Sequence, residues 1–440
     1  MDNKQENLKR EIGFLGLSSN IINTVIGSGI FVLPAIIAAA LGAASILAYV
    51  FCGILITLMM LCTAEVASKI TATGGVYIYI EKTFGKYPGF LTVCLLLLST
   101  ITGVGAIANA IVNVIFELFP FIEGEIVRIF FFLFMFSGLG YINIRGLKKG
   151  VGFVKIITII KIAPLLLIVL LGFKDVDLTN LVWESTPTIG QIGTTSLVLF
   201  FAFTGAGTAL SVSGEVRNPQ KTIPHAILFS IFVVGIIYVL VQTVSQGVLG
   251  ASLPSFTENP LGAVADKIFG PIGFTLITIG AAVSMFGAIS SQILSVPRVL
   301  FAASDDRVIP IKMLSKIHNK YITPHIAIIV FTSLCFIFAS FGGFKELAII
   351  SSAASLFIAL GVSIATIKLR KNKKFDSDGK TFKIPGGYIV PILSIIVIFW
   401  FLSNLSSNKI LGFGLLTAAL TILYFLINSR LIKRLTKSTN

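Results

Sequence analysis

Apolar stretches follow one another along most of the chain, separated by short polar or glycine-rich connectors. About 20 apolar residues are needed for a helix to cross the hydrocarbon core of a bilayer. The pattern predicts twelve membrane-spanning helices near residues 14–38, 44–69, 88–118, 127–145, 152–173, 191–213, 224–249, 270–303, 324–341, 346–368, 386–405 and 410–430. We therefore expect an all-α integral membrane protein.

Glycines interrupt two of these predicted helices at mid-depth. The first contains IGSGIF, with Gly27 and Gly29 on either side of Ser28, and the sixth contains FTGAG, with Gly205 and Gly207. Two glycines together cost a helix about 2 kcal/mol relative to alanine, so we expect both helices to break. The breaks lie five spans apart. Because five is an odd number of crossings, a second five-helix unit would start on the opposite side of the membrane and be inverted relative to the first, as in many secondary transporters.

The two breaks predict one shared binding site, because unwound backbone at membrane depth is tolerated only where it is buried or lines a wet cavity. The half-helix after a break offers N–H groups and a positive dipole end, and the half-helix before it offers free carbonyls. Such a site suits a zwitterion. We expect backbone contacts with a carboxylate at Ser28, Gly29 and Ile30, and with an ammonium group at Val25, Phe201 and Thr204, with Ile26, Gly27 and Gly205 completing the site. The alternative is that the glycines only permit close helix packing.

Lys161 is the ionisable residue placed deepest in an apolar stretch. It lies nine residues past the start of the fifth predicted span, which is roughly 14 Å into the bilayer at 1.5 Å per residue. A charged residue there costs about 2.5 kcal/mol or more and is normally paired, functional or neutral. The alternative is a lysine that extends its ammonium group to the interface. We expect Lys161 to have a functional role.

Composition supports the membrane assignment, since 55% of the 440 residues are hydrophobic and 12% are charged. The net charge of +15 does not indicate a nucleic-acid partner, because most of the 34 Lys and Arg residues fall at the termini and in the connectors that follow even-numbered spans. By the positive-inside rule those segments are cytoplasmic, so both termini are expected inside and the protein in the cytoplasmic membrane. The four cysteines lie in apolar runs without a CxxC pair, so neither a disulfide, a metal site nor a cofactor is expected.

Four segments resemble the amino acid, polyamine and organocation (APC) superfamily in their order and spacing. They are IGSGIF at 26–31, AEVASKITATGGVYIYIEKTFGKYPGF at 64–90, FAFTGAGTALSVSGEVRNPQKTIPHAI at 201–227 and SVPRVLFAASDDRVIPIKMLSKIH at 295–318. The resemblance runs from about residue 10 to at least residue 385. It implies the LeuT fold, with discontinuous first and sixth helices and two inverted five-helix repeats at 14–173 and 190–370. These follow a cytoplasmic segment, 1–13, and precede a region, 371–440, with a connector, two trailing helices and a tail.

The resemblance also implies residues that face the substrate. By position in the family pattern these are Ser99, Gly103 and Val104 in the third span, Gln292 in the eighth and Ser352 in the tenth. For Ser99 and Gln292, ordinary hydrogen bonding between helices is the alternative. Phe201 or Phe203 matches the aromatic residue with which relatives cover bound substrate.

In the resembling family, a lysine at the position of Lys161 takes the place of the sodium ion of sodium-coupled relatives. Its ammonium group would donate to carbonyls near Ile22 to Ile26, with Ser290 or Ser291 as further partners. This implies sodium-independent transport, either coupled to protons or by exchange.

These features predict a secondary active transporter of neutral L-amino acids that works by alternating access. Many relatives have a bulky residue and an acid after the sixth-helix glycine, where this chain has Ala206 and Gly207. A cationic substrate would then lack a counter-charge. A basic amino acid or polyamine exchanger remains the nearest rival, and an amino acid sensor that uses residues 368–383 as a docking surface is the alternative from another class. An enzyme is not expected, because no nucleophile motif accompanies the three histidines. Oligomeric state is left open.

Overall fold

The computed structural model describes residues 10–70, 75–146, 151–183, 185–309, 311–371 and 381–437, without the side chains of 151–160, 211–212 and 428–437. Most of the predicted segment 1–13 and part of the connector that begins at 371 lie outside the described residues. Within the described ranges the chain is helical, with one isolated backbone bridge between Ile12 and Val216. Eight helical stretches of this part are long and apolar enough to cross a membrane, and two shorter apolar helices accompany them.

The helices before residue 175 include two pieces of the first predicted span and one short helix that the apolar pattern did not predict, α4. In chain order they are α1 (Phe14–Val25), α2 (Gly29–Leu41), α3 (Ser45–Lys69), α4 (Val76–Phe84), α5 (Lys86–Leu118), α6 (Glu125–Ile144) and α7 (Val151–Gly172). With nine residues, α4 is too short to cross a bilayer.

The second half begins with the pieces of the sixth predicted span. Its helices are α8 (Ile189–Leu199), α9 (Ala206–Ala209), α10 (Pro219–Leu249), α11 (Pro260–Asp305), α12 (His325–Phe341), α13 (Phe344–Lys371), α14 (Ile389–Ser403) and α15 (Ser407–Lys437). The start of α11 precedes the predicted start of the eighth span by ten residues, because a further helical segment joins it across a kink. At the kink Gly270 has φ +71° and Pro271 lacks an N–H donor.

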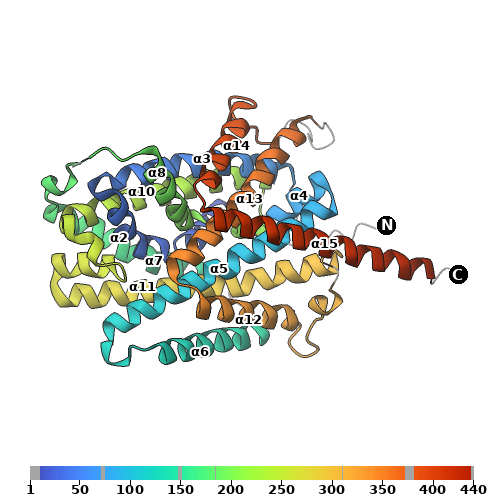
Figure 1. Ribbon diagram of the computed structural model, residues 1–440, viewed down its shortest axis with the longest axis horizontal. Coiled ribbons are helices and arrows are strands. Elements are labelled where there is room, and N and C mark those ends of the chain that lie inside the picture. The colour runs from blue at the N-terminus through green and yellow to red at the C-terminus, as the bar shows by residue number, and fades with distance from the viewer. Residues whose placement is uncertain are drawn as a thin grey trace.

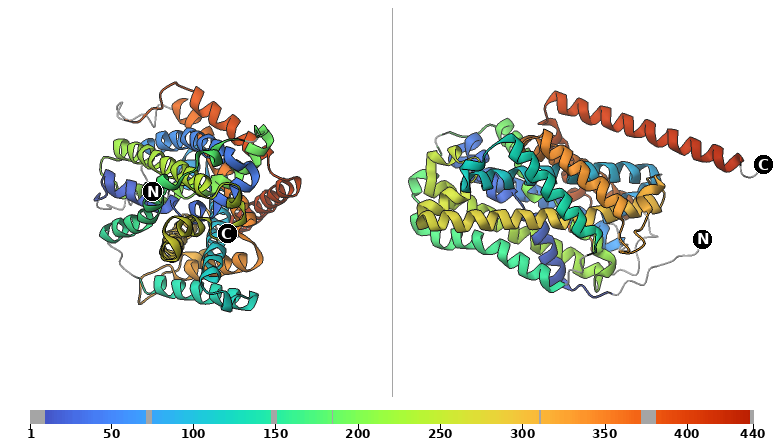
Figure 2. Two further views of the ribbon diagram at one scale, coloured as in Figure 1. Left: turned by 90° about the vertical axis from the view of Figure 1, so that its left-hand side faces the viewer. Right: turned by 90° about the horizontal axis from the view of Figure 1, so that it is seen from below.

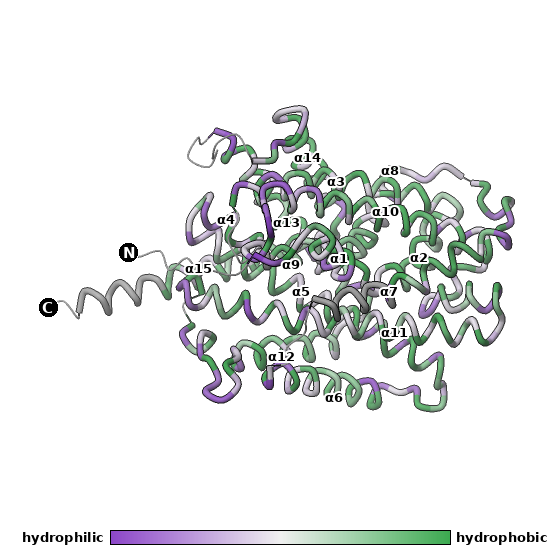
Figure 3. Tube along the Cα trace, turned by 180° about the vertical axis from the view of Figure 1, so that it is seen from behind, coloured by the Kyte–Doolittle hydropathy of each residue, from purple (hydrophilic) through white to green (hydrophobic). Residues whose placement is uncertain are grey.

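The long helices form one bundle, with α5 crossing its centre and packed against α13 and α11. On one side α6 packs against α12, and on the other α3 packs against α10 (Figure 1). The helix α15 runs beyond the rest of the bundle, as the right-hand view in Figure 2 shows. Apolar residues cover most of the helix lengths, and hydrophilic ones gather chiefly toward the two ends of the bundle (Figure 3). This distribution is the one that a bilayer requires.

A buried ion cluster ties three segments together at the end of the bundle where α3 and α13 finish, called the basic end below. The Glu65 carboxylate is fully buried and accepts hydrogen bonds from the Arg370 guanidinium, one of 2.8 Å from Nε to Oε1. The ammonium group of Lys69 lies 3.3 Å from the same carboxylate, and the Ile384 N–H donates to it at 3.0 Å. A buried carboxylate with this many partners holds the ends of α3 and α13 and the chain before α14 in one arrangement.

Candidate binding site between two broken helices

The first predicted break is confirmed at residues 26–28. The helix α1 ends at Val25, and Ile26 has extended backbone with φ −71° and ψ 93°. The helix α2 starts at Gly29, where the Ser28 carbonyl accepts the N–H groups of the residues three and four positions later at 3.0 and 3.1 Å. The N–H groups of Gly29 and Ile30, which come before these two, have no acceptor within the helix.

The second break is also confirmed, but its outgoing half is shorter than expected. A 3₁₀ turn from Phe200 to Phe203 follows α8, and Gly205 has left-handed backbone with φ +101°. Only one α-helical turn, α9, comes next, before a 3₁₀ segment at Leu210–Glu215. The Thr208 hydroxyl donates to the carbonyl of Gly205 at 2.6 Å. Such local bonds compete with a regular helix.

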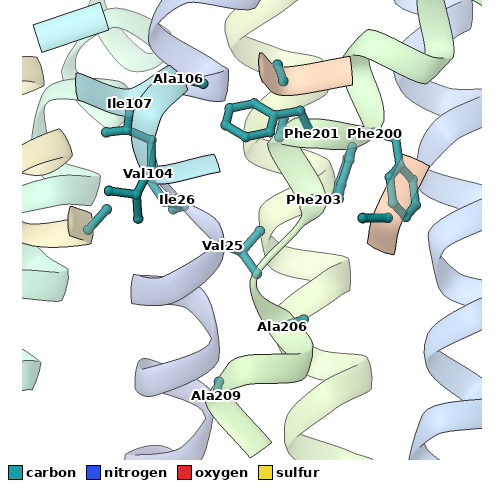
Figure 4. Packing of buried hydrophobic residues seen from close by; sticks show 14 of the residues in the cluster. Val25, Ile26, Val104, Ala106, Ile107, Phe200, Phe201, Phe203, Ala206 and Ala209 are labelled. Carbon is teal, nitrogen blue, oxygen red and sulfur yellow. The ribbon is translucent and has the colours of Figure 1, made fainter. Parts of the chain in front are cut away.

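The two breaks touch each other through their glycines. A Cβ atom at Gly29 would lie 2.6 Å from the Cα of Ala202, and one at Gly205 would lie 2.9 Å from the carbonyl oxygen of Thr24. Neither position has room for a methyl group, because both contacts are with backbone atoms. Figure 4 shows the meeting point, with Val25 near the chain that carries Phe203. Glycine is required here for close approach as well as for unwinding.

Tyr238 of α10 connects the two breaks through its hydroxyl group. Its hydroxyl oxygen lies 2.9 Å from the carbonyl oxygen of Ala202 and 3.4 Å from that of Val25. Its ring packs on Phe203 with centroids 5.1 Å apart, and the side chain is fully buried. The sequence analysis missed this residue, although a tyrosine in the middle of an apolar span was a signal, because a buried hydroxyl group needs a partner.

Lys161 of α7 reaches the first break. Its Nζ donates to the carbonyl of Asn23 at 3.0 Å and to that of Ile26 at 3.3 Å, within the stretch that the resemblance implied. The side chain is only 1% exposed, so it does not extend to the surface. Carbonyls that lost their helical partners at the end of α1 are thus satisfied by a side chain of another helix.

A cavity of about 110 Å³ lies beside the two breaks. One water molecule occupies about 10–15 Å³ of such a cavity volume, so the space is several times larger than a single water site. Its wall comes from the two breaks, α3, α5, α11 and α13, with Val76 of α4 at one edge. Among the residues that the structure describes, none that lines the cavity is ionisable. It therefore has room for a small molecule and offers only backbone, hydroxyl, amide and apolar groups to it.

Most of the predicted contact residues line this cavity. They are Val25, Gly27, Ser28, Gly29, Ser99, Gly103, Val104, Phe201, Phe203, Thr204, Gly205 and Gln292. In the described part of the molecule, Ser28 Oγ and Gln292 Oε1 are buried and have no hydrogen-bond partner. These two atoms are free to meet a ligand.

Three predicted residues do not line the cavity. Ile26 and Ile30 are fully buried in the core, and the carbonyl of Ile26 is already used by Lys161. Ser352 is also fully buried, while Ser351 and Ser355 of the same helix are in the wall. One residue turns a helix by about 100°, so Ser351 and Ser352 lie on different faces of α13.

The cavity continues along α3 and α13 toward the basic end, through residues that the sequence analysis did not name. On α3 these are Ile56, Met59, Met60 and Thr63, and on α13 Ser351, Ser355, Ile358, Ala359 and Val362. Their spacing of three to four residues is that of one helix face. This periodicity was present in the sequence, but nothing distinguished the cavity face from a face packed against another helix.

Among the described residues, no acidic side chain lines the cavity. Near its edge at the basic end, the Tyr77 hydroxyl donates to Asp306 Oδ2 at 3.4 Å. Burial, and then repulsion from Asp306, raises the pKa of the Glu81 carboxyl group. Burial, with a smaller contribution from Asp305, raises the pKa of Asp306, although its hydrogen bond from Tyr77 acts in the opposite direction. Within the described residues there is also no group of three or more His, Cys, Asp or Glu side chains that could hold a metal ion.

Comparison with known sequences shows the family to which this chain belongs. The family described as "Amino acid permease" matches residues 12–427. The serine/threonine exchanger of Bacillus subtilis is 31% identical over 94% of this chain and 95% of its own length.

Two further relatives are more distant. The branched-chain amino acid permease of Bacillus subtilis is 28% identical over 97% of this chain and 94% of its own length. The human cystine/glutamate transporter is 28% identical over 86% of this chain and 77% of its own length.

Proposed function

Because the chain belongs to the amino acid permease family, we propose that it is a secondary active transporter of neutral L-amino acids in the cytoplasmic membrane. The observation that carries this proposal is the cavity between the two breaks, in which no lining residue among those described is ionisable. A zwitterion can find both of its charges matched there by backbone dipoles. A cationic or anionic side chain would be left without a counter-charge.

In the proposed complex the substrate carboxylate meets the first turn of α2. Ser28 Oγ, which is buried and unpartnered among the described residues, lies at the start of this turn beside Gly29. An anion at a helix N-terminus is favoured by the dipole and by free N–H groups. The hydroxyl group of Ser28 gives the carboxylate one further donor.

The ammonium group meets carbonyls of the breaks, with one change from the sequence analysis. The carbonyl of Phe201 already accepts from the N–H and the hydroxyl of Thr204, at 3.1 and 2.7 Å. That of Ile26 is taken by Lys161. The proposed acceptors are therefore the carbonyl of Thr204 and that of Val25, which lies farther from the Tyr238 hydroxyl, at 3.4 Å, than the Ala202 carbonyl does at 2.9 Å.

We propose the twelve-span LeuT arrangement for the whole chain, with inverted repeats at 14–173 and 190–370 and both termini cytoplasmic. Two breaks in contact with each other and five spans apart support it. In this orientation the basic end is cytoplasmic, and the cavity extends toward the cytoplasm from the proposed substrate position. Alternating access would then begin from an inward-directed cavity.

Lys161 is the proposed coupling residue. Its ammonium group holds carbonyls of the first break, as a bound sodium ion would, so transport is expected to be independent of sodium and either proton-coupled or an exchange. Of the relatives above, one is named an exchanger and another a permease.

Purified protein in liposomes tests this function. We expect saturable uptake of radiolabelled neutral L-amino acids that is unchanged when sodium is replaced by choline. Uptake should rise with an inward proton gradient for symport, or with internal amino acid for exchange. Binding without uptake would instead indicate a sensor, and competition by lysine or spermidine in preference to neutral amino acids would indicate a basic substrate.

A further inference from the structure

Three serines form a hydrogen-bonded group in the cavity wall between α5 and α13. Ser99 Oγ lies 2.7 Å from Ser355 Oγ, 3.3 Å from Ser351 Oγ and 3.0 Å from the carbonyl oxygen of Ser351. In return, Ser351 Oγ donates to the carbonyl of Ser99 at 2.8 Å. All three residues line the cavity, and most of the other residues in its wall are apolar.

One assignment of the protons gives every hydroxyl group of these three serines an acceptor, since the pairing of Ser99 Oγ with Ser355 Oγ fits either oxygen as the donor. The Ser351 hydroxyl donates to the Ser99 carbonyl, and the Ser99 hydroxyl donates to the Ser351 carbonyl. The Ser355 hydroxyl then donates to Ser99 Oγ. With each proton engaged, the lone pairs of Ser351 and Ser355 remain as acceptors. Ser355 presents them to the cavity, because it is half-buried whereas Ser99 and Ser351 are buried.

The serine group lies within reach of the proposed substrate position. A Cβ atom at Gly103 would be 3.1 Å from Ser351 Oγ and 3.6 Å from the ring of Phe201, so the serine group and the second break lie close together at Gly103, with no side chain between them. Phe344 holds the Phe201 ring in an edge-to-face contact with centroids 5.7 Å apart. A side chain that extends from the breaks past Phe201 therefore reaches the serines.

From this arrangement, and resting on the proposed function, we propose that Ser99, Ser351 and Ser355 form the side-chain subsite and select amino acids that carry a hydroxyl group. A substrate hydroxyl group donates to the open lone pairs of Ser355 or Ser351. An apolar side chain of the same shape excludes water from these oxygens without replacing its hydrogen bonds. Sites that hydrogen-bond a substrate hydroxyl group discriminate against analogues that lack it for this reason.

Threonine and valine provide the test, because they have nearly the same shape and differ in one hydroxyl group. The ratio of their uptake efficiencies, kcat/KM for threonine over kcat/KM for valine, is measured in liposomes for the wild type and for Ser355→Ala and Ser99→Ala. The wild type should prefer threonine. Each substitution should lower the ratio by about three- to tenfold, the effect of one hydrogen bond, chiefly by weakening threonine uptake.

Ser363→Ala is the matched control, because Ser363 lies two turns further along α13 and donates to Ala359 with Ser394 as its other neighbour, outside the cavity wall. It should leave the ratio unchanged. If Ser355→Ala does not fold, Ser355→Cys keeps the size of the side chain with a much weaker hydrogen-bonding group and should lower the ratio in the same direction.

The possible outcomes separate this inference from the proposed function. If the wild type transports neither amino acid nor any other neutral one, the proposed function is wrong. If it transports both but prefers valine, or if the ratio is unchanged in Ser355→Ala and Ser99→Ala, the function stands and the hydroxyl selectivity is wrong.

Discussion

The two breaks look alike in sequence and differ in what satisfies their backbone. The carbonyls of Asn23 and Ile26 at the first break are held by Lys161, a cation that arrives from α7. The carbonyls of Phe201 and Gly205 at the second break are held by the hydroxyls of nearby threonines in the same segment. Neutral hydrogen bonds within the segment hold the backbone of the second break. The backbone of the first break is held by Lys161, whose amino group can change its charge. The first break is therefore the better candidate for coupling.

Lys161→Ala is the substitution that should break this comparison most strongly. Without the lysine, two buried carbonyls lose their partner, and an unsatisfied buried group costs about 1–3 kcal/mol. We expect uptake to fall at least about tenfold and to lose its dependence on pH. Lys312→Ala, at an exposed lysine of the basic end, is the control and should behave as the wild type. Full uptake with an unchanged pH profile in Lys161→Ala would contradict the role.

Alanine at Gly29 or at Gly205 should have the second largest effect, because each new methyl group would push against the backbone of the other break. In Gly29→Ala the new methyl group meets Ala202 backbone, and in Gly205→Ala it meets Thr24 in a residue that also needs positive φ. Overpacking and backbone strain each cost about 1–3 kcal/mol, so the melting temperature in detergent should fall. Gly27→Ala is the stability control, since its nearest new neighbour would be Ile107 at 3.8 Å. Equal melting temperatures for all three variants would show that the breaks are not in contact.

Tyr238→Phe tests a side chain whose hydroxyl group reaches carbonyl groups of both breaks. The hydrogen bond to Ala202 is lost while the ring contact with Phe203 remains, so a loss of about 1 kcal/mol and a fall of several-fold in uptake are expected. Tyr87→Phe is matched to it, because its hydroxyl pairs with Thr421 far from the breaks. A Tyr238→Phe protein with wild-type uptake would mean that the breaks need no brace from α10.

Thr204→Val should have the smallest effect. It removes one local hydroxyl bond to the Phe201 carbonyl, which still accepts the Thr204 N–H, so uptake should stay within about twofold of the wild type. Thr194→Val, at an exposed position of α8, serves as control. If Thr204→Val abolished uptake as completely as Lys161→Ala, the proposed difference between the breaks would be wrong.

The breaks and the lysine could be predicted because each violates a strong rule. Glycines at mid-membrane depth and a lysine in an apolar span are costly, so Gly29, Gly205 and Lys161 stood out without any knowledge of their neighbours.

Other parts of the site depend on helix rotation and on contacts between distant segments. Ser351 and Ser352 are the same residue type, so only the orientation of α13 decides which one lines the cavity. Tyr238 belongs to a different helix from both breaks, and the buried pair of Glu65 and Arg370 joins residues 305 positions apart. No local pattern specifies such pairings, since many buried partners would satisfy the same side chains.

The contact between Gly29 and Ala202 limits how the substrate range of this protein could be changed. Even a methyl group is too large at position 29. Only glycine therefore fits at this position, in the part of the site that meets the substrate backbone. The side chains of α5 and α13 around Ser99 and Ser355 have no such restriction. Evolution or design of a new cargo would therefore work on these two helices and leave the glycines as they are.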